Sequence, residues 1–238
     1  MKSFKKTSKR SVMAIGALCI LSVMLSSCLK DHTNDVPPTP ISVLSVVQGS
    51  PGQPTLNFTL DGSRVNTNPL ALGNVINYFN AYTGDRTAAF VNATSGAAVF
   101  SDKITLKQNT AYSLCLVGAT ATPSFLLLTD SLAQPASGMA GLRFVNLSPD
   151  DQPVDLAVSG GATIAANKHF KEFTPFQSVS GKTYNFEIRK AGTTTVLATM
   201  NSVTINSGYA YTIYLQGLAA STGADKLTGT LITNAQPN

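Results

Sequence analysis

Side chains that transfer protons are scarce in this sequence. It has two histidines, His32 and His169, and two glutamates, Glu172 and Glu187, among 238 residues. General acid–base catalysis and zinc binding depend on such groups, and neither histidine stands at a spacing typical of a catalytic triad or a metal site. We therefore predict no catalytic residue, no metal ligand and no cofactor, and we expect that the protein is not an enzyme.

Tryptophan is absent and cysteine is rare. The lack of tryptophan excludes the Cys-Trp-Cys pattern of true immunoglobulin domains. Of the three cysteines, Cys19 and Cys28 belong to an N-terminal targeting segment, which leaves Cys115 alone and excludes an internal disulfide. Within the stretch YSLCLVG, Cys115 is predicted to be a small buried residue on a strand rather than a reactive thiol.

The first residues have the pattern of a secretory signal peptide. Five basic residues precede Ser11, and the fourteen residues 12–25 then carry no charge. This run is shorter than the roughly 20 apolar residues that span a membrane, whereas a basic segment followed by a short apolar one is typical of export signals. Leu25-Ser26-Ser27-Cys28, at its end, resembles the lipobox of bacterial lipoproteins.

The lipobox resemblance implies that residues 1–27 are removed and that the thiol and the new amino group of Cys28 are acylated. Each buried methylene contributes about 0.8 kcal/mol, so several acyl chains make a stable anchor. An uncleaved signal anchor stays open as an alternative, because no charge interrupts Ser11 to Leu29. Either arrangement places the rest of the chain outside the cytoplasm, and we predict an outer-membrane lipoprotein.

Charge beyond the targeting segment is balanced. The chain has 17 Lys and Arg and 12 Asp and Glu, but five basic residues precede Cys28, so twelve of each sign remain. This balance gives no reason to propose nucleic acid as a partner. Residues 28–40, polar and rich in proline, are predicted to form a disordered tether that reaches about 40 Å when extended.

Acidic residues in the tether bear on which face of the membrane the protein occupies. Asp31 and Asp35 follow Cys28 closely. They resemble the signals that send some lipoproteins of Bacteroidetes-type bacteria to the outer face of the outer membrane. The periplasmic face and the cell surface both stay open.

The rest of the chain contains an internal repeat. ITLKQNTAYSLCLVG, residues 104–118, aligns without a gap with VTINSGYAYTIYLQG, residues 203–217. SPGQP from Ser50 matches SPDDQP from Ser148, and LNFTLDG matches VDLAVSG in the same order. Blocks that recur in one order at a nearly constant offset predict two copies of one structural unit.

Each copy is predicted to be an immunoglobulin-like β-sandwich. Apolar and polar residues alternate in short runs, as at Leu56, Phe58 and Leu60, and Gly, Asn, Asp and Pro separate the runs. This alternation is typical of strands with one buried face, and turns at such spacing indicate a two-sheet sandwich. We predict an all-β chain with two tandem domains, copy one at 41–132 and copy two at 138–238, and expect copy two to fold on its own.

Copy two also carries a family resemblance. Its segments GLRFVNLSPDDQPVDLAVSGG, FQSVSGKTYNFEI and GYAYTIYLQG resemble domain of unknown function 4397, often found as tandem copies in lipoproteins of Bacteroidetes-type bacteria. Copy one shares the weaker SVVQGSPGQPTLNFTLDG, in which Asn57 takes the place of Asp155. The resemblance implies a β-sandwich in an extracytoplasmic setting and no particular activity.

Two groups of residues are candidates for a site. Asp150, Asp151 and Asp155 have oxygens that suit a calcium ion, but Ser-Pro-Asp-Asp is also an ordinary turn in which Asp caps local amides, and we favour the turn. Ser131, in the triplet Asp130-Ser131-Leu132 between the copies, is similar to an O-glycosylation site of the same bacterial group. An exposed linker is the alternative.

Aromatic residues recur at corresponding positions of the two copies. We interpret them as core residues rather than a binding face, because a shared fold needs shared core volume whereas a ligand need not be shared. These residues are Tyr78, Phe79 and Tyr82 in copy one and Phe173, Phe176 and Val179 in copy two.

These features favour a non-enzymatic binding or surface-display module that a lipid holds at the membrane, with an unknown protein or glycan as ligand. The alternative is a hydrolase of envelope polymers or glycans. It would need an acid–base pair that folding brings to roughly 5 to 9 Å, such as Glu172 with Glu187 or Asp155.

Replacing Cys28 tests the anchor. Because the thiol is where the lipid attaches, Cys28→Ala should leave the precursor uncleaved by the lipoprotein signal peptidase and unlabelled when cells grow with radioactive palmitate. Cys115→Ala is the control and should label normally. Normal labelling of Cys28→Ala would contradict the anchor.

Overall fold

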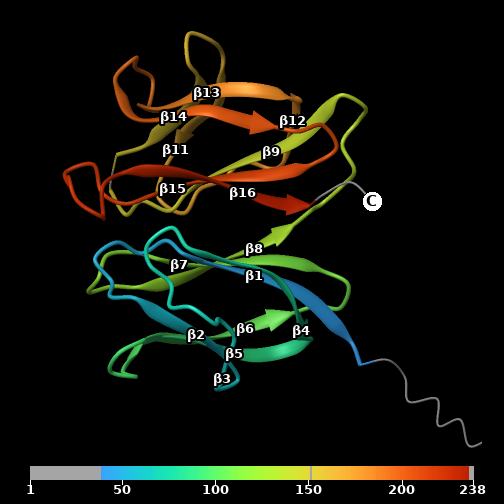
Figure 1. Ribbon diagram of the computed structural model, residues 1–238, viewed down its shortest axis with the longest axis vertical. Helices are drawn as coiled ribbons and strands as arrows, with labels where there is room; N and C mark the ends of the chain where they lie inside the picture. Colours follow the sequence, from blue (N-terminus) through green and yellow to red (C-terminus); the bar gives the residue numbers. More distant parts are fainter. Residues whose placement is uncertain (1–38, 151, 236–238) are drawn as a thin grey trace, which may run out of the picture. The chain divides into compact units, whose positions relative to one another are not determined.

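The structure, a computed structural model, describes residues 39–150 and 152–235 (Figure 1). The predicted signal peptide, Cys28, most of the tether and Asp151 lie outside the described residues. In the described ranges, no helix is long and apolar enough to cross a membrane. These ranges form strands that are gathered in four sheets of four strands each.

Copy one consists of two sheets. Sheet A has the strand order β4-β1-β7-β8, and sheet B has the order β3-β2-β5-β6. Neighbouring strands are antiparallel, except that β1 and β7 are parallel. The strands are β1 (Ile41–Gln48), β2 (Leu56–Leu60), β3 (Ser63–Arg64), β4 (Val75–Tyr82), β5 (Gly84–Asn92), β6 (Ala98–Leu106), β7 (Ala111–Val117) and β8 (Ser124–Asp130).

Copy two repeats this plan. Sheet C has the order β12-β9-β15-β16, and sheet D has the order β11-β10-β13-β14. Here β9 and β15 form the parallel pair. The strands are β9 (Met139–Asn146), β10 (Val154–Val158), β11 (Thr163–Lys168), β12 (Gln177–Ser180), β13 (Lys182–Lys190), β14 (Val196–Ile205), β15 (Ala210–Gln216) and β16 (Thr228–Ala235).

The two copies correspond strand for strand. Each strand of copy two takes the position of the strand eight places earlier in the chain. Figure 1 shows the strands of copy one in blue to green and those of copy two in yellow-green to red. The predicted fold class, an all-β chain with two tandem β-sandwiches, is confirmed for the described residues.

The repeated sequence blocks meet at the same place in each copy. Ser50 and Ser148 begin the SPGQP and SPDDQP turns, and both are buried. The Ser50 hydroxyl donates to the carbonyl of Gly118 at 2.6 Å, and that of Ser148 donates to Gly217 at 2.7 Å. The two glycines have φ angles of 97° and 91°, which glycine adopts without strain. The blocks recur together because each turn binds the end of a distant strand.

Each sandwich has its own hydrophobic core between its two sheets. Phe58 on β2 and Phe90 on β5 pack in copy one, with ring centroids 5.2 Å apart. Phe186 on β13 and Ile213 on β15 pack in copy two. Because these side chains are almost fully withdrawn from water, their burial is a main stabilising contribution, at about 25 cal/mol per Å².

A third apolar cluster joins the two copies on the faces of sheets A and C that point away from these cores. Along β7, Leu114 packs in the core of copy one, whereas Cys115 and Val117 pack in the third cluster. We call it the shared cluster; its buried members are Val47, Cys115, Val117, Leu128, Val145, Leu147 and Tyr214.

The shared cluster changes one expectation from the sequence and supports another. Strands with a single buried face occur in sheets B and D, but β1, β7, β9 and β15 are buried on both faces for most of their length. The single-face prediction is wrong for these four strands, because each central strand faces its own core on one side and the other copy on the other. Cys115 is a fully buried strand residue, as predicted.

Separating the copies tests the contribution of the shared cluster. Residues 138–238 expressed alone retain their own core but expose Val145, Leu147 and Tyr214. We expect a cooperative urea transition with a free energy of unfolding lower by roughly 4 kcal/mol than that of copy two in the full chain.

Hydrogen exchange of copy two within the full chain supplies the reference value. Equal stability in the two settings would mean that the shared cluster contributes nothing. A fragment without a cooperative transition would mean that the core of copy two is insufficient.

Candidate functional site

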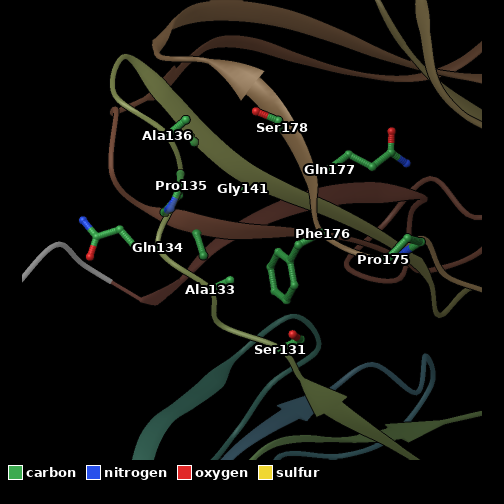
Figure 2. A pocket seen from close by; sticks show the side chains of 12 residues that line it. Ser131, Ala133, Gln134, Pro135, Ala136, Gly141, Pro175, Phe176, Gln177 and Ser178 are labelled. Carbon is green, nitrogen blue, oxygen red and sulfur yellow. The ribbon is translucent and has the colours of Figure 1, made fainter.

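The connector between the copies borders a hollow of about 300 Å³, which we call the connector pocket (Figure 2). One wall is the connector itself. The other is built from the start of β9, the start of β12 with the two residues before it, and the first residue of β15. Its lining consists of Ser131, Ala133, Gln134, Pro135, Ala136, Ala140, Gly141, Pro175, Phe176, Gln177, Ser178 and Ala210.

Small residues leave this space open. Ala140 and Gly141 lie on β9, and Ala210 begins β15 beside them. A Cβ atom on Gly141 would lie 3.6 Å from Cδ1 of Phe176 and 3.7 Å from Cβ of Ala210, so a larger side chain there would extend into the hollow. These strands therefore form one wall of the pocket, and their small side chains leave its interior open.

Phe176 is the one aromatic residue of the lining. It directly precedes β12 and is partly buried. Figure 2 shows its ring projecting toward the connector, with Ala133 and Ser131 on the connector side. The guanidinium carbon of Arg143 lies 4.6 Å from the ring centroid, a cation–π contact that fixes the ring in place.

The polar part of the lining is neutral. Gln134 and Gln177 bring amide groups, and Ser131 and Ser178 bring hydroxyl groups. These groups donate and accept hydrogen bonds but do not transfer protons near neutral pH. An aromatic ring with amides and hydroxyls around it suits the binding of an uncharged ligand and provides no general acid or base.

A buried ion pair lies behind Phe176. Arg143 on β9 contacts Asp130, the last residue of β8, with Nη1 and Oδ1 2.6 Å apart. The side chains are only 2% and 0% exposed. Arg143 Nε also donates to Thr212 at 3.1 Å, and the Ser113 hydroxyl donates to Asp130 Oδ2 at 2.7 Å. A buried charge needs such partners, and here each copy supplies one of the two charges.

The ion pair belongs to a larger polar network across the two copies. The Tyr78 hydroxyl donates to Asp130 Oδ2 and accepts from Asn234 Nδ2 at 3.0 Å. Thr212 donates to Asn234 Oδ1 at 2.6 Å. Burial and the neighbouring Asp130 charge raise the pKa of Tyr78, so the hydroxyl stays protonated and remains a donor. None of the residues in this network was predicted to form a polar site, although a lone arginine within the apolar strand GLRFVN is a signal for it.

The acidic candidates cap backbone amides. Asp150 Oδ2 accepts from Ala219 N at 2.7 Å. Asp155 accepts from Asn167 N at 2.7 Å and from Gly192 N at 2.9 Å, one bond to each oxygen. Asp151 lies outside the described residues. Asp150 and Asp155 thus cap amides, as the turn interpretation expects, but amides of distant segments rather than of the local turn. In the described part of the chain no group of three His, Cys, Asp or Glu side chains is placed to hold a metal ion.

The glycosylation candidate lies at the rim of the connector pocket. Ser131 is exposed and lines it. Asp130, the first residue of the triplet, is instead buried against Arg143. In the folded protein the triplet therefore does not present its carboxylate at the surface.

The six residues at the corresponding positions of the two copies have several roles, so their interpretation as core residues is correct only in part. Phe79 and Val179 pack against the cores of their copies. Tyr82 and Phe173 are among the exposed large apolar residues, at 61% and 46%. Tyr78 belongs to the polar network, and Phe176 lines the connector pocket.

The carboxylates of the hydrolase alternative are engaged locally. Glu172 accepts from His169 N at 2.9 Å in the connection before β12. Glu187 on β13 accepts from Ser159 at 2.7 Å and from Arg189 at 2.6 Å. These two contacts lower the pKa of Glu187, whereas a catalytic acid of a glycosidase needs a raised pKa.

About half of the chain matches the model of a known protein family. Residues 42–157 match the family model described as Domain of unknown function (DUF4397). The match confirms a DUF4397 domain at residues 42–157. It covers copy one and ends within β10 of copy two, although the motifs were clearest in copy two.

Solved structures show only distant similarity. The Bacillus anthracis TIE protein has 9% identity and a TM-score of 0.26 over 74% of this chain and 34% of that one, so this chain spans about a third of its length. A family 26 carbohydrate-binding module of Eubacterium rectale Amy13K, in complex with maltoheptaose, has 12% identity and a TM-score of 0.24 over 81% and 97%. Scores this low carry no argument. No curated protein matches the chain.

The buried ion pair gives a prediction about stability. Asp130→Asn leaves the Arg143 guanidinium buried without a counter-charge, and we expect the free energy of unfolding to fall by about 3 to 5 kcal/mol in urea denaturation. Combining Arg143→Met with Asp130→Leu should recover most of this loss, because well-packed apolar groups can replace a buried pair.

Asp61→Asn is the matched control, because it removes the charge from the exposed Asp61–Arg86 pair. It should cost less than about 1 kcal/mol. Equal losses for Asp130→Asn and Asp61→Asn would contradict the assigned role of the buried pair.

Proposed function

We propose that this protein is a membrane-anchored, non-enzymatic binding module of the cell envelope and that its connector pocket holds a neutral, hydroxyl-rich ligand. The sugar units of an envelope glycan are the ligand class that this chemistry fits. The DUF4397 family is described as a domain of unknown function, so the family match does not indicate a ligand or an activity.

The observation that carries the proposal is the composition of the pocket lining. Phe176 offers an aromatic surface fixed from behind by Arg143. Sugar rings have apolar faces edged by hydroxyl groups, which match an aromatic ring surrounded by amides and hydroxyls. Gln134, Gln177 and Ser178 supply these polar groups. The volume of about 300 Å³ suits one or two sugar units.

Electrostatics favour an uncharged ligand. The lining itself carries no charge. Arg143, the cation closest to Phe176 in the contacts described above, is neutralised by Asp130 at 2.6 Å. An anionic or cationic ligand would give up its hydration without gaining an opposite charge, so the pocket discriminates against both.

The hydrolase alternative rests on one pair of neighbours. Asp155 pairs with Arg189, and Glu187 pairs with Ala157, so the two carboxylates are diagonal neighbours on β10 and β13. Both oxygens of Asp155 already accept backbone hydrogen bonds. Glu187 has a lowered pKa, which disfavours it as the proton donor that glycoside hydrolysis requires. This favours binding over hydrolysis.

The anchor in the proposal rests on the sequence before residue 39. The basic segment, the short uncharged run and the lipobox-like Leu25-Ser26-Ser27-Cys28 support export and acylation at Cys28. A lipid there would hold the sandwiches at the outer membrane, on its periplasmic or cell-surface face.

Replacing Phe176 tests the pocket. Neutral oligosaccharides prepared from the envelope should bind the protein, as measured by ligand-observed NMR, and Phe176→Ala should weaken binding by about tenfold or more. Phe176→Leu keeps an apolar cover over Arg143 but removes the aromatic face, and it should weaken binding by a similar factor.

Phe173→Ala is the matched control. It removes the same type of side chain from an exposed position three residues away that does not line the pocket, and it should leave binding unchanged. Binding that survives in both Phe176 variants would place the ligand elsewhere. Release of reducing sugar ends during the titration would support the hydrolase instead.

A further inference from the structure

Two large apolar side chains are exposed side by side at the end of sheet A where the described chain begins. Ile41, the first residue of β1, is 38% exposed, and Tyr82, the last residue of β4, is 61% exposed. They are direct cross-strand partners, which places their side chains next to each other on the same face. Pro40, also exposed, precedes Ile41.

The backbone holds this apolar patch in a fixed arrangement. Asn109 N donates to the Ile41 carbonyl at 3.0 Å, and Thr83 N donates to the Pro40 carbonyl at 3.3 Å. The patch thus lies where β1 begins and β4 ends, and the neighbouring turns hold it in place.

The length of the tether limits how far this patch can lie from a lipid attached to Cys28. Twelve residues separate Cys28 from Ile41. A flexible chain of that length has an average end-to-end distance of roughly 20 Å and a maximum of about 40 Å. An acyl group on Cys28 therefore keeps this edge of copy one within a tether length of the lipid surface at all times.

We infer that Pro40, Ile41 and Tyr82 dock into the headgroup region of the membrane that carries the lipid of Cys28. Tyrosine is enriched at membrane interfaces, because its ring is apolar and its hydroxyl stays hydrated. Tethering raises the local concentration of the lipid surface, so a patch too small to bind a membrane by itself suffices. The inference rests on the lipid anchor of the proposed function.

The absence of tryptophan makes the contact directly measurable. Tyr82→Trp introduces a single tryptophan into the chain. The mature protein, starting at Cys28, is coupled through that thiol to maleimide-lipid vesicles of phosphatidylethanolamine and phosphatidylglycerol. Cys115 does not compete, because it is fully buried and burial raises the pKa of its thiol to about 12. We expect a blue-shifted emission and quenching by lipids with brominated acyl chains.

Phe173→Trp is the matched control. It places the single tryptophan at another exposed aromatic position, in copy two, and its emission should not change on coupling. Adding Ile41→Ser to Tyr82→Trp removes a second apolar side chain from the patch and should weaken the docking equilibrium about tenfold.

The outcomes separate this inference from the proposed function. Unshifted and unquenched emission of Tyr82→Trp on vesicles would overturn the docking, as would an emission shift that appears without lipid and grows with protein concentration, which would identify a second copy as the occupant. Palmitate labelling of Cys28 in cells tests the anchor separately. Its absence would overturn the docking in the cell even if the coupled protein docks.

Discussion

The burial of both faces of the central strands is the constraint on which the rest of the structure depends. β1, β7, β9 and β15 have a core on one side and the other copy on the opposite side. Polar side chains on the inner faces therefore need partners within the protein, although the buried Tyr214 hydroxyl has none among the described residues. Arg143 and Asp130 meet this requirement as a pair, with Ser113 and Thr212 binding their remaining polar atoms.

The connector pocket follows from the same arrangement. Asp130 ends β8 and is held by Arg143, so the connector starts from a fixed point. Phe176 covers the guanidinium on the side that faces the pocket. One wall of the proposed binding pocket therefore rests on paired strands, which limits the conformational freedom that a ligand would have to remove there.

The strands, the turns and the repeat could be predicted from local sequence patterns. The contacts between distant segments could not. Alternation and the repeated blocks identified two sandwiches, whereas the Ser-Pro-Asp-Asp turn indicated a capping role for Asp150 without showing that the capped amide is that of the distant Ala219. The Asp130–Arg143 pair has no local pattern, because its network joins strands from both copies. Phe176 was interpreted as a core residue because its position recurs between the copies, yet the small residues Ala140 and Ala210 leave one side of it open.

The two copies differ in charge at one pair of corresponding positions. Ser45 pairs with Ser113 in copy one, and at the same place in copy two Arg143 pairs with Thr212. Only one half of the molecule supplies a cation, and the other half supplies the anion. Two identical halves packed through this face would bury two like charges, which costs free energy, whereas a first half packed on a second half places the anion beside the cation.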